Sequence, residues 1–354
     1  MTGRTLLLRV AATGLSVAVL SGCLTDRPRE QPDEVLYDGD YVAARPVAPQ
    51  GWPAIVWPKE NPYSPAKDIL GRRLFFDGRL SSSLDRACSW CHGPNAAFAD
   101  MHGERFSTGV GSGITTRNTP TLANMAFSRR FMLDGSAASL EEQALGPIFA
   151  PHEMGADEAV ILARLQADTA YVRLFRAAYG EGPVTLEGVV RALATYQRTL
   201  ISHRSAYDRW QAGDAGALSA SAQRGHALFV APVNACASCH APPLFTDGGF
   251  HNIGLDLASL DPGRAGVTGA AADSGKFKTP TLRNIAATPP YMHDGRFRKL
   301  EEVIAHYNAG GHAHPNANAR IRPLSLSAQD QADLVAFLEA LTDSAFLATR
   351  PYLP

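Results

Sequence analysis

Cys88-Ser89-Trp90-Cys91-His92 is one of two copies of a five-residue pattern, and the other copy is Cys236-Ala237-Ser238-Cys239-His240. Cys-x-x-Cys-His is the signature of covalent c-type haem attachment. The two thiols can each form a thioether with a haem vinyl group, and the histidine that follows can bind the iron. A thioredoxin-like redox pair needs no trailing histidine, and a four-cysteine zinc site would not add one to both halves. We therefore expect two covalent haems, held by Cys88, Cys91 and His92 and by Cys236, Cys239 and His240.

Length, charge and cysteine content narrow the class of protein. A chain of 354 residues is expected to form about two domains. The formal net charge of −1 gives no reason to expect a nucleic-acid partner. Four of the five cysteines belong to the haem motifs, so Cys23 has no partner for a disulfide.

The N-terminus has the pattern of an export signal. A short apolar run ends at Leu20 and is too short to span a bilayer stably. It leads into Leu20-Ser21-Gly22-Cys23, which resembles the bacterial lipobox. We expect 1–23 to be a lipoprotein signal peptide and the only membrane contact to be a lipid on Cys23. Because Leu24 rather than aspartate follows, the expected location is the periplasm, anchored to the outer membrane. Ordinary signal cleavage beside an incidental cysteine is the alternative.

The rest of the chain is expected to be helical. Residues 24–62 are rich in proline and acidic residues and predict a tether followed by an extended arm. Ser64-Pro65 suits the start of a helix, and Thr185 and Ser327 are natural caps of later ones. Apolar side chains recur at helical spacing in 157–166, 169–179, 186–200, 222–229, 300–307 and 328–341. No stretch alternates as a strand, so the predicted class is all-α with long loops.

An internal repeat sets the domain organisation. Asn118-Thr119-Pro120-Thr121-Leu122-Ala123-Asn124 returns as Lys278-Thr279-Pro280-Thr281-Leu282-Arg283-Asn284. Phe131-Met132-Leu133-Asp134-Gly135 returns as Tyr291-Met292-His293-Asp294-Gly295. Each copy follows its own haem motif. We therefore expect two tandem cytochrome c-like domains, at 63–211 and 212–354.

These motifs together resemble the bacterial di-haem cytochrome c peroxidase family, which includes the MauG-type maturases of methylamine dehydrogenase. The resemblance runs from about residue 71 to residue 341 and includes Gly146-Pro147 leading to Glu153-Met154. It implies that hydrogen peroxide meets the N-terminal haem, that the C-terminal haem relays electrons, and that calcium lies between the two.

The resemblance also implies the residues of the peroxide site. His92 matches the proximal ligand of the reactive haem, Glu153 the distal acid–base residue, and Gln143 the distal glutamine. Cleavage of the O–O bond needs a base that takes a proton from one oxygen and returns it to the other, which a carboxylate over the haem can do. A surface glutamate on a loop is the alternative for Glu153.

The chain departs from the best-known peroxidases in three places. Val110 stands where those enzymes have a distal histidine, and valine cannot bind iron; His102 is nearby but out of register. Tyr307 stands where they have an axial methionine, and MauG-type proteins have tyrosine there. His306 or Met292 are the alternatives as second ligand of the C-terminal iron. Leu133 replaces a tryptophan between the haems, and the aromatic side chains that could substitute for it are Trp90, Phe131 and Tyr291.

For calcium, the resemblance implies oxygen ligands from Asn118, Thr288 and Pro290, a donor set that suits a hard cation. A plain turn residue is the alternative for Asn118.

We expect a di-haem peroxidase of the MauG-like branch that reduces hydrogen peroxide at the N-terminal haem. Electrons would arrive through the C-terminal haem from a small c-type cytochrome or a cupredoxin. Two alternatives remain open: an enzyme that oxidises residues of a partner protein, and a non-enzymatic di-haem electron carrier.

Overall fold

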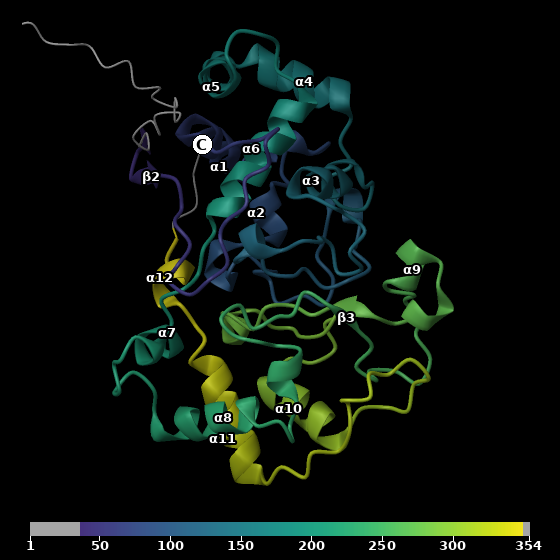
Figure 1. The fold of residues 1–354 in the computed structure, drawn as a ribbon. Helices are drawn as coiled ribbons and strands as arrows, with labels where there is room; N and C mark the ends of the chain where they lie inside the picture. The colour runs from purple at the N-terminus through teal and green to yellow at the C-terminus, as the bar shows by residue number, and fades with distance from the viewer. Residues whose placement is uncertain (1–35, 350–354) are drawn as a thin grey trace, which may run out of the picture. The chain divides into compact units, whose positions relative to one another are not determined.

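The computed structural model describes residues 36–349, all of which fall in one compact unit (Figure 1). The predicted signal peptide with Cys23, and residues 24–35 of the predicted tether and arm, lie outside the described residues. None of the helices within 36–349 is long and apolar enough to cross a membrane.

The first repeat is built from six helices, preceded by a two-stranded antiparallel ladder in which Leu36 pairs with Ala43. Its elements are β1 (Leu36–Asp38), β2 (Tyr41–Ala43), α1 (Pro65–Phe75), α2 (Cys88–Cys91), α3 (Leu140–Phe149), α4 (Glu158–Ala167), α5 (Thr169–Tyr179) and α6 (Leu186–Thr199). The predicted caps of α1 and α6 are confirmed, because the Ser64 and Thr185 side chains accept hydrogen bonds from the first turns of these helices.

The second repeat follows the short helix α7 (Ala206–Gln211). A second ladder pairs Phe250 with Lys278, and the Ser327 side chain caps α11 as predicted. The elements are α8 (Ala220–Val230), β3 (Phe250–His251), α9 (Ala265–Thr268), β4 (Phe277–Lys278), α10 (Leu300–Ala309), α11 (Ala328–Glu339) and α12 (Ser344–Leu347). The expectation of a mostly helical chain is confirmed, and the four strands that it missed have only two or three residues each.

The two repeats use the same helix crossing. In the first repeat α1 packs on α6, and in the second α8 packs on α11 (Figure 1). A Cβ atom on Gly71 would lie 1.9 Å from the Ala192 carbonyl oxygen, and one on Gly225 would lie 1.9 Å from that of Asp333. Both crossings therefore need a glycine at the point of contact. The equivalent positions of these two glycines support the conclusion that the chain contains an internal repeat.

The buried hydrophobic side chains form a main cluster in each repeat. The first gathers around α1 and α6 and includes Phe75 and Tyr196, and the second gathers around α8 and α11 and includes Phe229 and Phe337. Phe346 of α12 packs on the first cluster, with its ring 5.6 Å from that of Phe98.

Ser202 joins the repeats through equivalent asparagines. The Asn124 side chain donates to the Ser202 carbonyl oxygen at 3.1 Å, and the Asn284 side chain donates to the Ser202 hydroxyl at 2.9 Å. Both asparagines close the repeated Thr-Pro-Thr-Leu block and have left-handed backbone conformations. The linker is thus held by the same residue of each copy.

The Gly71 contact gives a prediction about stability. Gly71→Ala should lower the free energy of unfolding by about 1–3 kcal/mol, because the new methyl group forces α1 away from α6. Gly216→Ala is the matched control, since its Cβ would meet only the Asp214 carboxylate, at 3.6 Å. Thermal unfolding of the two variants measures the difference. Equal stability would show that α1 and α6 do not cross as closely as described.

Candidate haem sites

Each haem motif forms one short turn that ends at its histidine. The His92 backbone N–H donates to the Cys88 carbonyl oxygen at 3.0 Å, and that of His240 donates to Cys236 at 2.9 Å. Helix α2 and the equivalent 3-10 turn at Cys236–Ser238 therefore hold both cysteines of a motif within one turn of its histidine.

Both histidines are oriented for binding iron. Nδ1 of His92 lies 2.8 Å from the Phe98 carbonyl oxygen, and Nδ1 of His240 lies 3.0 Å from that of Phe245. A carbonyl only accepts, so Nδ1 carries the proton and Nε2 is left for the metal. Burial lowers the pKa of both histidines, which favours the neutral form that a metal requires.

A cavity adjoins each motif. The first has a volume of about 80 Å³ and is lined by Cys88, Cys91 and His92. The second has a volume of about 280 Å³ and is lined by Cys236, Cys239 and His240. Apolar atoms make up most of the surface of both cavities. A hydrophobic cavity that opens onto two thiols and a free imidazole nitrogen fits a covalently attached haem.

Glu153 and Gln143 line the first cavity together with His92. Gln143 comes from α3, and Glu153 from the turn that follows this helix. Burial raises the pKa of the Glu153 carboxyl group, opposed by the nearby His152, whose Nε2 lies 3.7 Å from Glu153 Oε1. A carboxyl group whose pKa is raised takes up a proton more readily than a free one, which suits a residue that takes and returns a proton.

The Val110 segment holds the Glu153 backbone in place. The Val110 N–H donates to the Glu153 carbonyl oxygen at 2.8 Å. A Cβ on Gly109 would lie 2.2 Å from the His152 carbonyl oxygen, so the two segments touch backbone to backbone. Sequence reasoning treated Val110 only as an absent ligand and missed this support.

No histidine other than His92 lines the first cavity in the part of the chain that the structure describes. His102 is exposed, and its ring packs at a tilt against that of Trp90 with centroids 4.6 Å apart. His102 is thus placed on Trp90 and away from the cavity.

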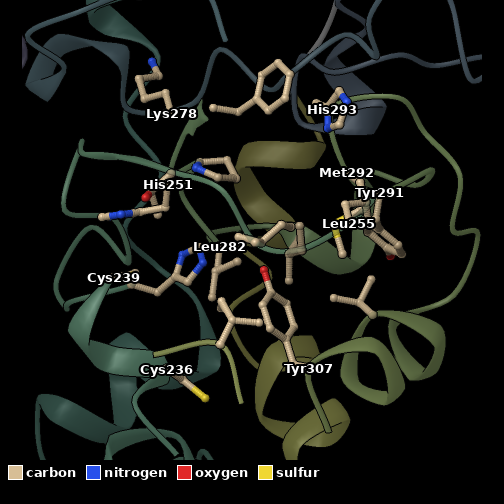
Figure 2. Close-up of a pocket in the computed structure, with 18 of the residues that line it drawn as sticks. Cys236, Cys239, His251, Leu255, Lys278, Leu282, Tyr291, Met292, His293 and Tyr307 are labelled. Atoms are coloured by element: carbon tan, nitrogen blue, oxygen red, sulfur yellow. The ribbon is translucent and has the colours of Figure 1, made fainter. Parts of the chain in front are cut away.

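Tyr307 projects from α10 into the second cavity. Figure 2 shows its ring reaching inward with the hydroxyl group innermost. The pKa of the Tyr307 hydroxyl is raised well above that of free tyrosine. Burial is the main cause, and the nearby thiols contribute less. Met292 also lines the cavity. His306 does not line it, and the His306 Nε2 lies 3.1 Å from the Ile253 carbonyl oxygen. Of the three candidate ligands, Tyr307 and Met292 face the site.

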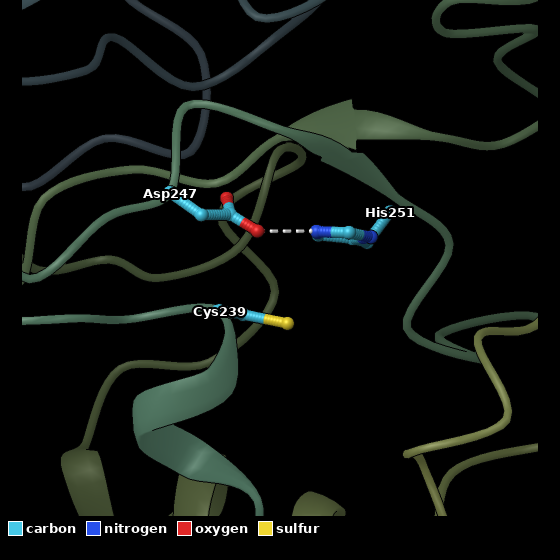
Figure 3. Close-up of side chains that lie close together, drawn as sticks. All are labelled: Cys239, Asp247 and His251. Carbon is cyan, nitrogen blue, oxygen red and sulfur yellow. Dashed lines mark hydrogen bonds and ion pairs between the residues drawn. The ribbon is translucent and has the colours of Figure 1, made fainter.

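Cys239, Asp247 and His251 form a cluster at the edge of the second site (Figure 3). His251 Nε2 lies 2.8 Å from Asp247 Oδ2, and the sulfur, imidazole and carboxylate ligand atoms lie within 4.8 Å of one another. Such a trio could hold a metal ion on its own. Because thioether formation uses the Cys239 sulfur, we assign the cluster to the haem site. Sequence reasoning missed Asp247 and His251, which no motif connects to Cys239.

The residues expected to bind calcium all belong to the lining of the second cavity. These residues are Asn118, Thr288 and Pro290. The Asn118 amide nitrogen donates to the carbonyl oxygens of Glu104 and Arg105, at 3.3 and 3.2 Å, which leaves its own amide oxygen for another partner.

Of the three aromatic side chains proposed as substitutes at Leu133, none lines both cavities in the described part of the chain. Leu133 lines the second cavity, and Thr119 lines both cavities. Of the aromatic side chains proposed as substitutes, Tyr291 lines the second cavity, Phe131 is buried in a separate small cluster, and Trp90 donates to the Thr108 carbonyl oxygen at 3.0 Å.

The sequence is similar to proteins of known families. The profile described as di-haem cytochrome c peroxidase matches residues 65–216, and that described as cytochrome c matches residues 222–342. The methylamine utilization protein MauG of Methylorubrum extorquens is 42% identical over 84% of this chain and 84% of its own length. The cytochrome-c peroxidase IdrP1 of Denitromonas iodatirespirans is 36% identical over 82% of this chain and 85% of its own length.

A solved structure has the same fold. The crystal structure of a MauG-like protein associated with microbial copper homeostasis superposes with a TM-score of 0.81 at 35% identity. The match covers 89% of this chain and 98% of that protein.

Proposed function

The chain belongs to the di-haem cytochrome c peroxidase family, and we propose that it reduces hydrogen peroxide at the His92 site with electrons relayed through the His240 site. It is an oxidoreductase that uses peroxide and has two c-type haems. The observation that carries the assignment of the two sites is that Glu153 and Gln143, the matches of the family's acid–base glutamate and distal glutamine, line the first cavity with His92, whereas Tyr307 projects into the second.

Three residues of the first site have separate roles in the reduction of peroxide. When bound, haem supplies the iron at which the O–O bond is reduced. Glu153 takes a proton from one peroxide oxygen and gives it to the other, which becomes water. Gln143 orients the peroxide by hydrogen bonding. The Val110 N–H fixes the backbone of Glu153, so that the carboxyl group keeps its position during both proton transfers.

At the second site we propose Tyr307 as the second iron ligand. Its hydroxyl group points into the cavity. Burial opposes ionisation of the free phenol, so ferric iron is the positive charge that would stabilise the phenolate. A hard anionic ligand favours the ferric state and lowers the reduction potential.

Tyr307→Phe should therefore change the ferric spectrum of the second haem and raise its reduction potential. The physical reason is the loss of an anionic oxygen ligand. Redox titration followed by absorption and electron paramagnetic resonance measures both effects. Met292→Leu is the matched control, since it removes the other candidate ligand in the cavity. A spectrum altered by Met292→Leu and unchanged by Tyr307→Phe would assign the ligand to Met292.

A second candidate function is the oxidation of residues in a partner protein. The identity of 42% to the MauG protein of M. extorquens and the tyrosine at position 307 favour it. The proposed electron donor for peroxide reduction is a small c-type cytochrome or a cupredoxin. Peroxide turnover with such a donor, compared with turnover on the precursor of methylamine dehydrogenase, separates the two functions.

Three further assignments are proposals. Calcium would bind Asn118, Thr288 and Pro290, which metal analysis of the purified holoprotein tests. The chain would be exported to the periplasm and anchored to the outer membrane through a lipid on Cys23, which membrane fractionation of the full chain tests. The two haem domains would meet at 211/212, which limited proteolysis tests.

A further inference from the structure

Tyr196 is a buried tyrosine whose hydroxyl group has no hydrogen-bond partner among the described residues. It lies on α6 and is 1% exposed. A buried hydroxyl without a partner lowers stability relative to phenylalanine, so packing alone does not explain the tyrosine.

The second repeat shows what packing alone requires at this position. A Cβ on Gly71 would lie 3.0 Å from the Tyr196 Cβ, and a Cβ on Gly225 would lie 2.9 Å from the Phe337 Cβ. Tyr196 and Phe337 are therefore equivalent residues of the two helix crossings. Phe337 is 0% exposed and fills its core without a hydroxyl group. The first repeat thus has a group that can be oxidised where the second has hydrocarbon.

Tyr196 belongs to a row of rings that leads from the first cavity to the surface. Phe75 lines that cavity, and its ring centroid lies 5.3 Å from that of Tyr196. The Tyr196 ring in turn lies 6.4 Å from the ring of Tyr41, a partly exposed residue on β2. Strand β2 packs on α1, which holds Tyr41 in this position.

Tyr41 has a proton acceptor. Its hydroxyl donates to Asp68 Oδ1 at 2.8 Å, and Asp68 is 1% exposed. The Arg72 guanidinium lies 4.5 Å from the centre of the Tyr41 ring and disfavours a positive charge on it. Oxidation of Tyr41 must therefore release the phenolic proton, and Asp68 is placed to take it.

We propose that Tyr196 and Tyr41 form a redox relay that carries an oxidising equivalent from the first haem site to the protein surface. The relay rests on the proposed function, because peroxide is the oxidant of that site. Tyr196 gives one electron to the site that peroxide has oxidised and keeps its phenolic proton, because no acceptor for it lies in the described residues. Tyr41 then gives one electron to Tyr196, which restores it. The Tyr41 O–H bond breaks, the proton forms a new O–H bond on Asp68, and a neutral tyrosyl radical remains. A one-electron reductant in solution restores the phenol, and Asp68 returns the proton.

The test uses the holoprotein with both haems and tyrosine deuterated on the ring. The protein is mixed with hydrogen peroxide without an electron donor, frozen, and examined by electron paramagnetic resonance. We expect a radical signal narrowed by the deuterium, which identifies it as tyrosyl. Tyr196→Phe and Tyr41→Phe should each lose this signal and keep the wild-type rate of reaction with peroxide.

Tyr179→Phe is the matched control. Tyr179 is on α5, does not line the first cavity, and donates to the Gly188 carbonyl oxygen at 2.8 Å, so its loss should leave the radical unchanged. A normal reaction with peroxide without a tyrosyl signal would overturn the relay and leave the peroxidase assignment intact. A signal that persists in both Tyr196→Phe and Tyr41→Phe would also overturn it. No reaction with peroxide in the wild type would overturn the proposed function and the relay with it.

Discussion

Glu153→Gln should slow the reaction of the ferric protein with hydrogen peroxide by about 10²–10⁴-fold, the range for loss of one positioned acid–base group. Glutamine has nearly the same shape as glutamate and can accept the same peroxide hydrogen bond, but it cannot take up and return a proton. The ferric absorption spectrum should stay unchanged, because Glu153 is assigned to proton transfer and not to the iron. Stopped-flow absorption with excess peroxide measures the rate.

Glu158→Gln is the control for this prediction. Glu158 is exposed in the first turn of α4 and does not line the first cavity, so its replacement should leave the rate unchanged. If Glu153→Gln reacts at a rate within about threefold of wild type, the loss is far smaller than expected for an acid–base residue. Another residue would then move the proton. His152, with Nε2 3.7 Å from Glu153 Oε1, would then be the next residue to replace.

The double variant Cys236→Ser, Cys239→Ser should abolish peroxide turnover with an external electron donor. Serine forms no thioether, so the second haem is not retained and electrons lose their route to the first site. The mass of the intact chain should fall by one haem relative to wild type. The first site should still react once with peroxide, because Cys88, Cys91, His92 and Glu153 are unchanged.

Cys23→Ser is the control, and it should retain both haems and full turnover. Wild-type turnover in the double variant would show that donors deliver electrons to the first site directly. The same result would remove the reason for assigning an electron-transfer role to the His240 site.

The sequence predicted the helices well where apolar side chains recur at regular spacing. Helices α4, α5, α6, α8, α10 and α11 begin and end within two residues of the predicted bounds. Helix α3 was not predicted, because Gly146-Pro147 is typical of a helix end. The helix nevertheless continues through Pro147 to Phe149, and this continuation positions the turn that presents Glu153.

The candidate site was predictable only where a local motif encodes it. The two Cys-x-x-Cys-His motifs specify their own attachment geometry, so the sequence alone located both sites. The contacts of Glu153 with Val110 and of Cys239 with His251 join segments that no local spacing connects. The same holds for Tyr196, whose unpartnered hydroxyl becomes significant only beside Phe337 in the equivalent packed position.

The resting ferric protein tests the central claim most directly, namely that the first haem is open to peroxide. Val110 leaves no histidine to displace, and His102 packs against Trp90 and does not line the cavity. Electron paramagnetic resonance of the fully oxidised holoprotein should show a high-spin signal from the first haem. That signal should disappear on adding peroxide without prior reduction. A resting low-spin signal from a haem with two histidine ligands, removed by His102→Ala, would contradict the account.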